Sequence, residues 1–275
     1  MIVVDAVSHV FGDRSAGHRQ ALAAARQRAG RERIRRALGA TLALDDVSLE
    51  ISAGELFVVM GLSGSGKSTL VRLINGLLQP SAGAVMVDGQ NVAAMSKREL
   101  VAFRRHRIAM VFQSFALFPH RTVAENATFG LKVEGMSRPN RDERARKWLH
   151  RVGLDQLMDA YPHQLSGGMR QRVGLARALC VEAPIMLMDE PFSALDPITR
   201  VDLQDLTLEL QHELARTIVF VTHDFAEANR LADRIAVLHE GQVAQVGAPE
   251  AIKAAPASDH VARFIAAATQ TQNGA

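Results

Sequence analysis

The chain has 275 residues, of which 48% are hydrophobic and 22% are charged, and its formal net charge is +3. This composition is typical of an ordinary globular protein and excludes an intrinsically disordered chain. The sequence has no run of about 20 apolar residues, no signal-peptide pattern at its start and a single cysteine, so we expect a cytoplasmic protein without disulfides that would reach a membrane only through partners.

The first predicted elements are two short strands, residues 2–10 and 47–51, separated by an arginine-rich arm. Residues 13–40 hold eight arginines and two acidic residues, a local charge of +6, so the remainder of the chain carries −3. Because the basic excess is confined to one arm, the charge does not favour a general nucleic-acid binder.

The arm has the pattern of two short helices. Gly30 separates two groups of apolar residues that lie on different helical faces: Leu22, Ala25 and Ala29, then Ile34 and Leu38. One continuous interfacial helix is therefore disfavoured. We expect both helices to dock near Phe11 with their arginines facing outward, and electrostatic sensing of an anionic membrane is the alternative.

A strand over residues 56–60 leads directly into a glycine-rich loop and then a helix over about residues 67–77. The loop fits G-x-x-x-x-G-K-[ST] without a gap, a pattern in which backbone N–H groups wrap a phosphate chain. The helix start adds its positive dipole end, Lys67 supplies charge for the β and γ phosphates, and Ser68 supplies an oxygen for Mg²⁺. The predicted nucleotide-binding loop is Gly61, Leu62, Ser63, Gly64, Ser65, Gly66, Lys67, Ser68 and Thr69.

Strand and helix signals then alternate. A strand is predicted at residues 85–88, and a mainly helical stretch, about residues 98–178, is expected to form an inserted subdomain. Later strands are predicted at residues 185–188, 218–222, 235–238 and 243–246. This alternation predicts an α/β fold around a parallel sheet.

Two carboxylates follow the strand over residues 185–188. Asp189 is placed to hold the Mg²⁺ shell, and Glu190 to polarise an attacking water as general base. An apolar run that ends in Asp-Glu is weak evidence on its own. A nucleotide-binding loop, however, needs such carboxylates on another strand to form a hydrolytic site. Together they predict a nucleotide-hydrolysing site that uses ATP and Mg²⁺.

The segment Leu165-Ser-Gly-Gly-Met-Arg-Gln171 resembles the signature sequence of ABC ATPases, and the resemblance covers about residues 1–255. It implies a P-loop NTPase core of the RecA-like kind with an antiparallel β subdomain and an inserted α-helical subdomain. Ser166, Gly167 and Gly168 open a helix whose N–H groups form a second anion site. In this family two chains form a head-to-tail dimer in which each signature, here including Gln171, caps the γ-phosphate on the partner's loop.

The resemblance also assigns roles to other residues. Gln113 is similar to the Q-loop glutamine that contacts Mg²⁺ and water, and Ser193 and Asp196 to D-loop residues at the dimer interface. His223 is similar to the switch histidine that contacts the γ-phosphate. Phe11 is the candidate for stacking on adenine, with a place in the core as its alternative.

The segments over residues 61–69, 108–120 and 165–177 resemble importers of glycine betaine, proline and choline. The segment over about residues 12–42, which contains the arm, resembles a helical insertion of that family. This implies a peripheral subunit at the cytoplasmic face of the plasma membrane, with permease subunits as partners and a periplasmic or lipid-anchored binding protein as an indirect one. The chain ends soon after residue 255, so we expect a short tail and no CBS modules, which leaves ionic-strength gating open. Glycine betaine, choline, proline and histidine remain alternative solutes.

Residues 114–118 form an apolar cluster after Gln113. They are expected either to couple the chain to the permease or to belong to the subdomain core. Three other classes share some of these motifs: chromosome-structure or DNA-repair ATPases, translation-associated cassette proteins and simple P-loop kinases. The short spacing from Lys67 to Ser166 argues against the first class, and the single cassette argues against the second. The signature segment argues against a simple kinase. We therefore expect no nucleic-acid partner.

Overall fold

The computed structural model describes residues 1–12, 16–27 and 30–270, and its contacts divide the chain into two compact units. Unit 1 combines Met1–Leu100 with Val221–Ala275, and unit 2 is Val101–Phe220. Within the described residues, no helix is both long and apolar enough to cross a membrane.

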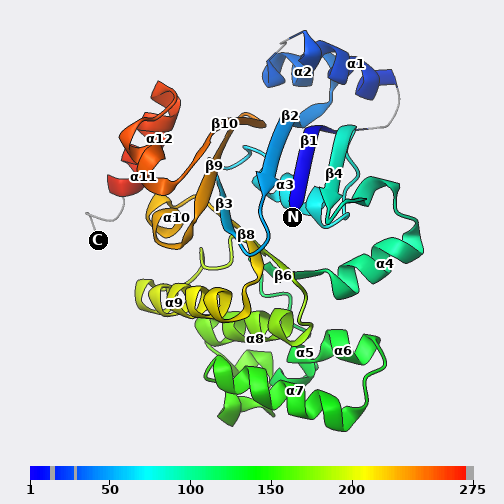
Figure 1. The fold of residues 1–275 in the computed structure, drawn as a ribbon, viewed down its shortest axis with the longest axis vertical. Helices are drawn as coiled ribbons and strands as arrows, with labels where there is room; N and C mark the ends of the chain where they lie inside the picture. Colours follow the sequence, from blue (N-terminus) through cyan, green and yellow to red (C-terminus); the bar gives the residue numbers. More distant parts are fainter. Residues whose placement is uncertain (13–15, 28–29, 271–275) are drawn as a thin grey trace. The chain divides into compact units, whose positions relative to one another are not determined.

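Unit 1 contains two groups of strands (Figure 1). Its strands are β1 Ile2–Phe11, β2 Thr41–Ile51, β3 Leu56–Met60, β4 Ala82–Val87, β5 Gln90–Asn91, β9 Arg234–His239 and β10 Gln242–Gly247. Its helices are α1 Ala16–Arg26, α2 Arg31–Leu38, α3 Lys67–Ile74, the short 3₁₀ turn Val92–Ala94, α10 Phe225–Leu231, α11 Pro249–Ala254 and α12 Asp259–Gln270, and α4 Lys97–His106 leads into unit 2.

The antiparallel sheet has the order β2-β1-β4-β5. The β1–β2 ladder runs from the pair Ile2↔Ile51 to the pair Phe11↔Thr41, with register shifts along it. Ala6 and Asp46 have left-handed φ values of 47° and 52° in these irregular stretches, as expected for bulges. β2 therefore begins earlier than the predicted residue 47, because its pairing with β1 continues on the far side of the bulges.

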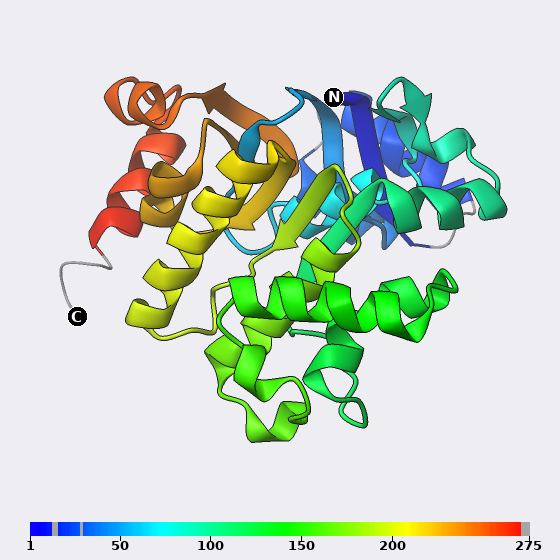
Figure 2. The same ribbon diagram turned by 60° about the horizontal axis from the view of Figure 1, so that its bottom comes forward.

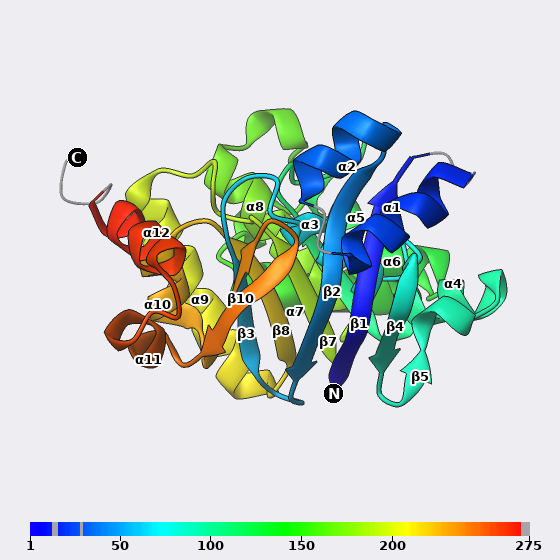
Figure 3. The same cartoon turned by 90° about the horizontal axis from the view of Figure 1, so that it is seen from above.

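The second group has the order β10-β9-β3, in which β3 runs parallel to β9 and β10 runs antiparallel to it. All five residues of β3 are buried, which agrees with an apolar run typical of a parallel strand covered on both faces. Figure 3 shows β10 alongside β2, and the two strands are in contact. This contact brings the β9–β10 turn toward the antiparallel sheet.

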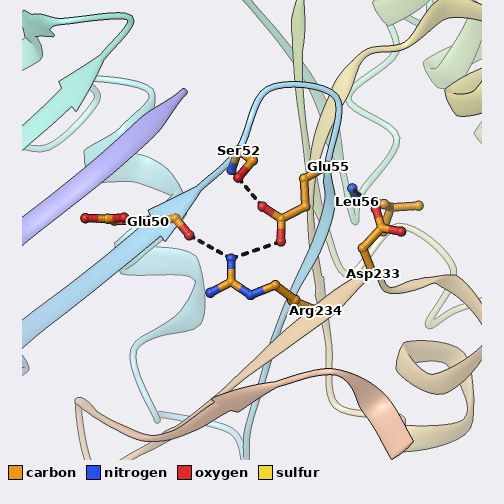
Figure 4. Close-up of polar contacts among 6 residues, drawn as sticks. All are labelled: Glu50, Ser52, Glu55, Leu56, Asp233 and Arg234. Carbon is orange, nitrogen blue, oxygen red and sulfur yellow. Dashed lines mark hydrogen bonds and ion pairs between the residues drawn. The ribbon is translucent and has the colours of Figure 1, made fainter.

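A polar junction ties the β2–β3 connection to β9 (Figure 4). The Arg234 guanidinium donates to the carbonyl of Glu50 at 3.3 Å and to the carboxylate of Glu55 at 3.2 Å. Glu55 also accepts from the backbone N–H of Ser52, and the Asp233 carboxylate accepts from the N–H of Leu56 at 2.8 Å. The buried Glu55 carboxylate is thus paired and hydrogen-bonded, as a buried charge requires.

The arginine-rich arm forms two helices, α1 and α2, that lie side by side at one end of β1 and β2 (Figure 1). Their apolar residues share one cluster with the strands, which contains Val10, Ala21, Ala25, Ile34, Ala40 and Leu42, with Leu22, Ala24 and Leu38 packed against it. The two helices agree with the expectation, but their apolar faces meet in one cluster instead of remaining separate. Ala29 lies outside the described residues.

One predicted helix differs in extent, and the tail contains a helix that was not predicted. α3 ends at Ile74 instead of residue 77, because Gly76 adopts a left-handed φ of 65° and the N–H groups of Leu77 and Leu78 bond back to Arg72. The expected C-terminal tail contains α12, which packs on α10 (Figure 3) and buries Val261, Phe264 and Ile265.

Unit 2 combines a short parallel sheet with most of the predicted helical stretch. The elements are β6 Ile108–Phe112, α5 Val123–Ala127, α6 Phe129–Val133, α7 Arg138–Arg151, two 3₁₀ turns at Asp155–Leu157 and Pro162–Gln164, α8 Gly167–Cys180, β7 Ile185–Asp189, α9 Pro197–Leu214 and β8 Thr217–Thr222, which ends across the unit boundary. The strand order is β8-β7-β6, and β6 runs parallel to β7. The helices α5, α6 and α7, green in Figure 2, pack against α8.

Candidate functional site

The glycine-rich loop joins β3 to α3, and its glycines occupy positions that other residues would not fit. Gly61, Gly64 and Gly66 have φ values of 152°, 79° and 108°. A Cβ on Gly61 would lie 2.2 Å from the carbonyl oxygen of Leu238, and one on Gly66 would lie 2.7 Å from that of Ala43. The close backbone approach from both sides therefore requires glycine at these two positions.

Lys67, the first residue of α3, is 5% exposed. Its ammonium group donates to the carbonyl oxygens of Gly61 at 2.8 Å and Leu62 at 3.2 Å, inside its own loop. The hydroxyl of Ser65 is buried and has no hydrogen-bond partner among the described residues. A buried cation and an unsatisfied hydroxyl at a helix start are groups that a phosphate would satisfy.

The β9–β10 turn supports this loop, a contact that the sequence analysis did not foresee. The N–H of Gly241 donates to the carbonyl of Ser65 at 3.0 Å, and the carbonyl of Gly241 accepts from the N–H of Asp45 at 2.9 Å. Glu240 and Gly241 both have positive φ, as in a tight turn. The loop that this turn supports lies far away in the sequence.

Phe11, at the end of β1, is 40% exposed. Its ring stands edge-on to that of His9, with the ring centroids 4.6 Å apart, and His9 bonds to the carbonyl of Gln79. This exposure does not fit the alternative that Phe11 is a core residue. A half-exposed aromatic ring supported on one edge is suited to stacking, and adenine contact remains a prediction.

His223 follows the last residue of β8 and is exposed. The next residue, Asp224, caps α10: its carboxylate accepts from the N–H groups of Ala226 and Glu227. His223 therefore lies in a short turn held by a helix cap, which fixes its backbone. It belongs to unit 1, as does the glycine-rich loop.

In unit 2, the register of β6 and β7 aligns the other predicted polar residues. Phe112 of β6 is paired with Asp189 of β7, so Gln113 and Glu190 leave the carboxyl ends of neighbouring parallel strands. The Gln113 amide donates to the hydroxyl of Ser193 at 3.2 Å, and that hydroxyl donates to the carbonyl of Glu190 at 3.1 Å. Parallel-strand ends are where ligand sites of α/β sheets form.

The Gln113 contact also bears on metal binding. Gln113 donates to Ser193 through its Nε2 atom. Its side-chain carbonyl oxygen is therefore the atom that would coordinate a metal ion. With the half-buried carboxylate of Asp189 on the next strand, the set consists of oxygen ligands, which Mg²⁺ prefers. These residues therefore fit a magnesium site.

The signature segment begins α8. Ser166 is its exposed N-cap residue, and its hydroxyl accepts from the N–H of Met169 at 3.3 Å. A Cβ on Gly168 would lie 2.4 Å from the methyl group of Thr199 in α9, so this glycine permits close packing of the two helices. The exposed N-terminus of a 14-residue helix is a favourable anion site.

Gln171 is placed differently from the expectation that it contacts nucleotide. It is fully buried, and neither amide atom has a hydrogen-bond partner within the described part of the chain. The reason is helical periodicity: Gln171 lies three residues after Gly168 and four before Leu175, on the stripe of α8 that faces the interior.

The segment after β7 leads into α9 through Ser193 and Asp196, both of which are exposed. Asp196 is the N-cap of α9 and accepts from the N–H of Thr199 at 3.0 Å, and this hydrogen bond lowers the pKa of Asp196 below its ordinary value. Both residues are thus accessible on a segment with a defined conformation. Their role at a dimer interface remains a prediction.

The loop after Gln113 is held by two side chains that the sequence analysis missed. Asn126, fully buried in α5, bonds to the N–H and the carbonyl of Phe118, and Arg177 of α8 donates to the carbonyls of Phe115 and Ala116. Phe118 itself is half-buried against Phe129, with ring centroids 4.5 Å apart. The buried part of the Phe118 side chain thus agrees with the alternative that this residue belongs to the subdomain core.

The predicted site residues form two sets. Unit 1 holds the glycine-rich loop with Phe11 and His223, and unit 2 holds Gln113, the carboxylates, the signature segment and the segment after β7. Within unit 2, one hydrogen-bond chain connects Gln113, Ser193 and the backbone of Glu190.

Comparison with known proteins shows which family has this combination of a glycine-rich loop and a signature segment. The family model described as "ABC transporter" matches residues 44–193. The glycine betaine/proline betaine transport ATP-binding protein of Salmonella typhimurium is 53% identical over 234 residues, which are 85% of this chain and 58% of that protein. The glycine betaine transport ATP-binding protein of Bacillus subtilis is 47% identical over 264 residues, which are 96% of this chain and 62% of that protein.

The structural comparison agrees. A solved ATP-binding cassette, a dimer in a post-hydrolysis state bound to ADP and phosphate, has a TM-score of 0.76 and 33% identity, over 90% of this chain and 99% of that one. The fold is thus that of an ABC ATPase cassette. The chain spans about 60% of the length of the curated relatives it matches, 58% and 62% for the two named above.

Proposed function

The chain belongs to the ABC transporter family, and from that premise we propose that it binds and hydrolyses ATP to power an importer of small amine or amino-acid solutes. The observation that carries the proposal is the glycine-rich loop of unit 1. Its buried Lys67, and the buried hydroxyl of Ser65 that has no hydrogen-bond partner among the described residues, lie at a helix start. Such an environment suits a phosphate chain.

The reaction is attack of water on the γ-phosphorus of ATP, with ADP as the leaving group. Lys67 and the loop N–H groups neutralise and orient the phosphates, and Glu190 accepts a proton from the attacking water. His223 contacts the γ-phosphate, and Phe11 stacks on adenine. The last two roles follow from the family resemblance, supported by the exposure of both side chains.

Gln113 and Asp189 of unit 2 would supply oxygen ligands for Mg²⁺, which when bound neutralises charge on the phosphate oxygens, and the loop motif assigns the same role to the hydroxyl of Ser68. The Gln113–Ser193 hydrogen bond supports this assignment, because it orients the amide of Gln113. Ser193 thereby connects the metal-facing glutamine to the backbone of the catalytic Glu190.

The working unit is a homodimer in which Ser166, Gly167 and Gly168 of one chain cap the γ-phosphate bound by the other. The exposed Ser166 at the start of α8, and the exposed Ser193 and Asp196 of the same unit, support this assignment. A helix N-terminus presents unsatisfied N–H groups to an anion, and the partner's nucleotide supplies one.

The transported solute is a quaternary amine or a related small amino acid, with glycine betaine, choline, proline and histidine as the candidates. Relatives whose names specify transport of glycine betaine, proline betaine, carnitine, choline or trimethylamine N-oxide support this class. The chain acts at the cytoplasmic face of the membrane, bound to permease subunits that receive solute from an external binding protein, and it binds no nucleic acid.

Two measurements test this function. Purified chain should hydrolyse ATP in a Mg²⁺-dependent manner, and Lys67→Ala should bind nucleotide more weakly because the phosphate-paired charge is lost. Tagged chain recovered from membranes of its own organism should co-purify with permease subunits, and the reconstituted complex should take up radiolabelled betaine only with ATP. Recovery of DNA or ribosomes in place of a permease would contradict the importer assignment.

A further inference from the structure

Arg31, the first residue of α2, differs from the other arginines of that helix. Arg33, Arg35 and Arg36 are exposed, whereas Arg31 is half-buried. Its guanidinium donates to three backbone carbonyls, those of Leu42, Ala43 and Gly64. The first two belong to β2, and the third, at 3.2 Å, belongs to the glycine-rich loop. A residue of the arm thus bonds directly to the predicted phosphate-binding loop.

Strand β2, to which Arg31 is hydrogen-bonded, packs on the glycine-rich loop. The carbonyl of Ala43, one of its acceptors, would lie 2.7 Å from a Cβ on Gly66 and equally close to one on Gly241. Gly241 in turn donates to the carbonyl of Ser65. Two consecutive carbonyls of the loop, those of Gly64 and Ser65, are therefore held from outside, one by the arm and the other by the β9–β10 turn.

The remainder of α2 anchors the arginine. Ile34, one turn further along, is 1% exposed and belongs to the apolar cluster with Val10 and Leu42. Burial lowers the pKa of Arg31 from its ordinary value while the nearby Glu240 and Asp45 raise it, and a guanidinium stays protonated in either case. Arg31 is therefore a fixed cation with planar donor geometry that matches several carbonyls at once.

Peptide geometry links this contact to nucleotide binding. Because a peptide unit is planar, fixing the carbonyl of Gly64 also fixes the direction of the Ser65 N–H. That N–H donates to the carbonyl of Leu62 at 3.1 Å and closes the turn of the loop. A loop that is already ordered loses less conformational entropy when it binds its ligand.

We propose that Arg31 is a positioning residue for the glycine-rich loop. Through Arg31, the arginine-rich arm raises the affinity of the chain for nucleotide. The proposal rests on the proposed function, because it assumes that the loop binds the phosphates of ATP and ADP. The arm thus acts on the nucleotide site of its own chain.

The test compares Arg31→Ala with Arg35→Ala in the full chain. Both variants remove one positive charge from α2, so a difference in affinity between them does not come from net charge, and Arg35 is exposed. Titration with a fluorescent ADP analogue and Mg²⁺ should show about three- to tenfold weaker binding for Arg31→Ala, the size of the net contribution of one typical hydrogen bond. Arg35→Ala should bind as wild type does, and Arg31→Lys should fall between.

Steady-state hydrolysis separates positioning from loss of folded protein. Arg31→Ala should raise the KM for ATP by the same factor and leave kcat close to that of wild type, whereas partial unfolding lowers kcat at constant KM. The proposal is overturned by a lowered kcat with unchanged KM, by wild-type affinity in Arg31→Ala, or by equal weakening in Arg35→Ala. A wild-type chain that binds no nucleotide would instead overturn the proposed function.

Discussion

Glu190 combines a predicted catalytic role with an unusual backbone. It immediately follows β7 and has a left-handed φ of 46°, which costs free energy for a residue with a side chain and is common at functional sites. Its carbonyl is held by the hydroxyl of Ser193, which also accepts from Gln113. The local structure thus maintains a strained residue at the strand end where the general base is expected.

Glu190→Gln should bind ATP as well as wild type does and lose most of its turnover, by about 100-fold or more, because the amide keeps the size of the side chain but cannot act as a base. Closed dimers with trapped nucleotide should accumulate. ATPase assays and size-exclusion chromatography with ATP measure both effects.

Glu182→Gln is the matched control for this prediction. Glu182 is an exposed glutamate after α8 with a similar left-handed φ of 55°, so its substitution tests the loss of charge at such a position. It should hydrolyse ATP at the wild-type rate. Turnover near the wild-type rate in Glu190→Gln would rule out Glu190 as the base.

At the level of elements, α8 connects the signature segment to the loop after Gln113. Its N-cap is Ser166, and ten residues beyond its first residue Arg177 donates to the carbonyls of Ala116 at 2.6 Å and Phe115 at 3.1 Å. Burial lowers the pKa of Arg177, and Phe115 and Ala116 have left-handed φ values of 58° and 47°. One helix therefore supports a strained loop that begins at the predicted metal ligand.

Arg177→Ala should lower ATP turnover more than nucleotide affinity, because it releases the loop next to Gln113 and leaves the glycine-rich loop in unit 1 unchanged. The lost bonds to a charged donor should also reduce the free energy of unfolding by about 1–3 kcal/mol. Measurements of kcat, nucleotide affinity and chemical denaturation separate these effects.

Arg172→Ala serves as the control on the same helix. Arg172 donates to the carbonyl of Val152 at 3.1 Å, away from the loop that follows Gln113. It should lose some stability and retain turnover. An equal loss of turnover in the two variants would mean that any weakening of α8 suffices, and that the loop contact has no special role.

At the level of the whole molecule, the predicted chemistry is divided between two units, with the phosphate loop in unit 1 and the signature helix in unit 2. Each is a helix start suited to an anion. The proposed head-to-tail dimer accounts for both, because each nucleotide then contacts the loop of one chain and the signature of the other. Hydrolysis should consequently require two chains.

Mixing Ser166→Arg chains with Lys67→Ala chains should restore part of the activity that neither variant has alone. In a mixed dimer, one of the two sites combines an intact loop with an intact signature, whereas every site in the parent dimers lacks one of them. ATPase activity across a range of mixing ratios, with mixed dimers isolated by two affinity tags, measures the recovery. Isolated mixed dimers without activity would argue against a shared site.

Local patterns in the sequence determined a large part of this protein. The β3 strand, the glycine-rich loop, the β7 strand with Asp189 and Glu190, and the two helices of the arm were all predictable. Each depends on residues that are close in the sequence: apolar runs, glycines that permit positive φ, and the spacing of apolar residues around a helix. The family resemblance arose from the same short segments.

The tertiary structure decided which side chains those segments bring together. The sequence did not distinguish Arg31 from the other seven arginines between residues 13 and 40, because its acceptors lie on β2 and in the loop at Gly64. It did not predict that Gln171 is buried or that Gly241 donates to Ser65. These features depend on contacts between residues distant in the chain, and a local pattern does not contain the identity of a distant partner.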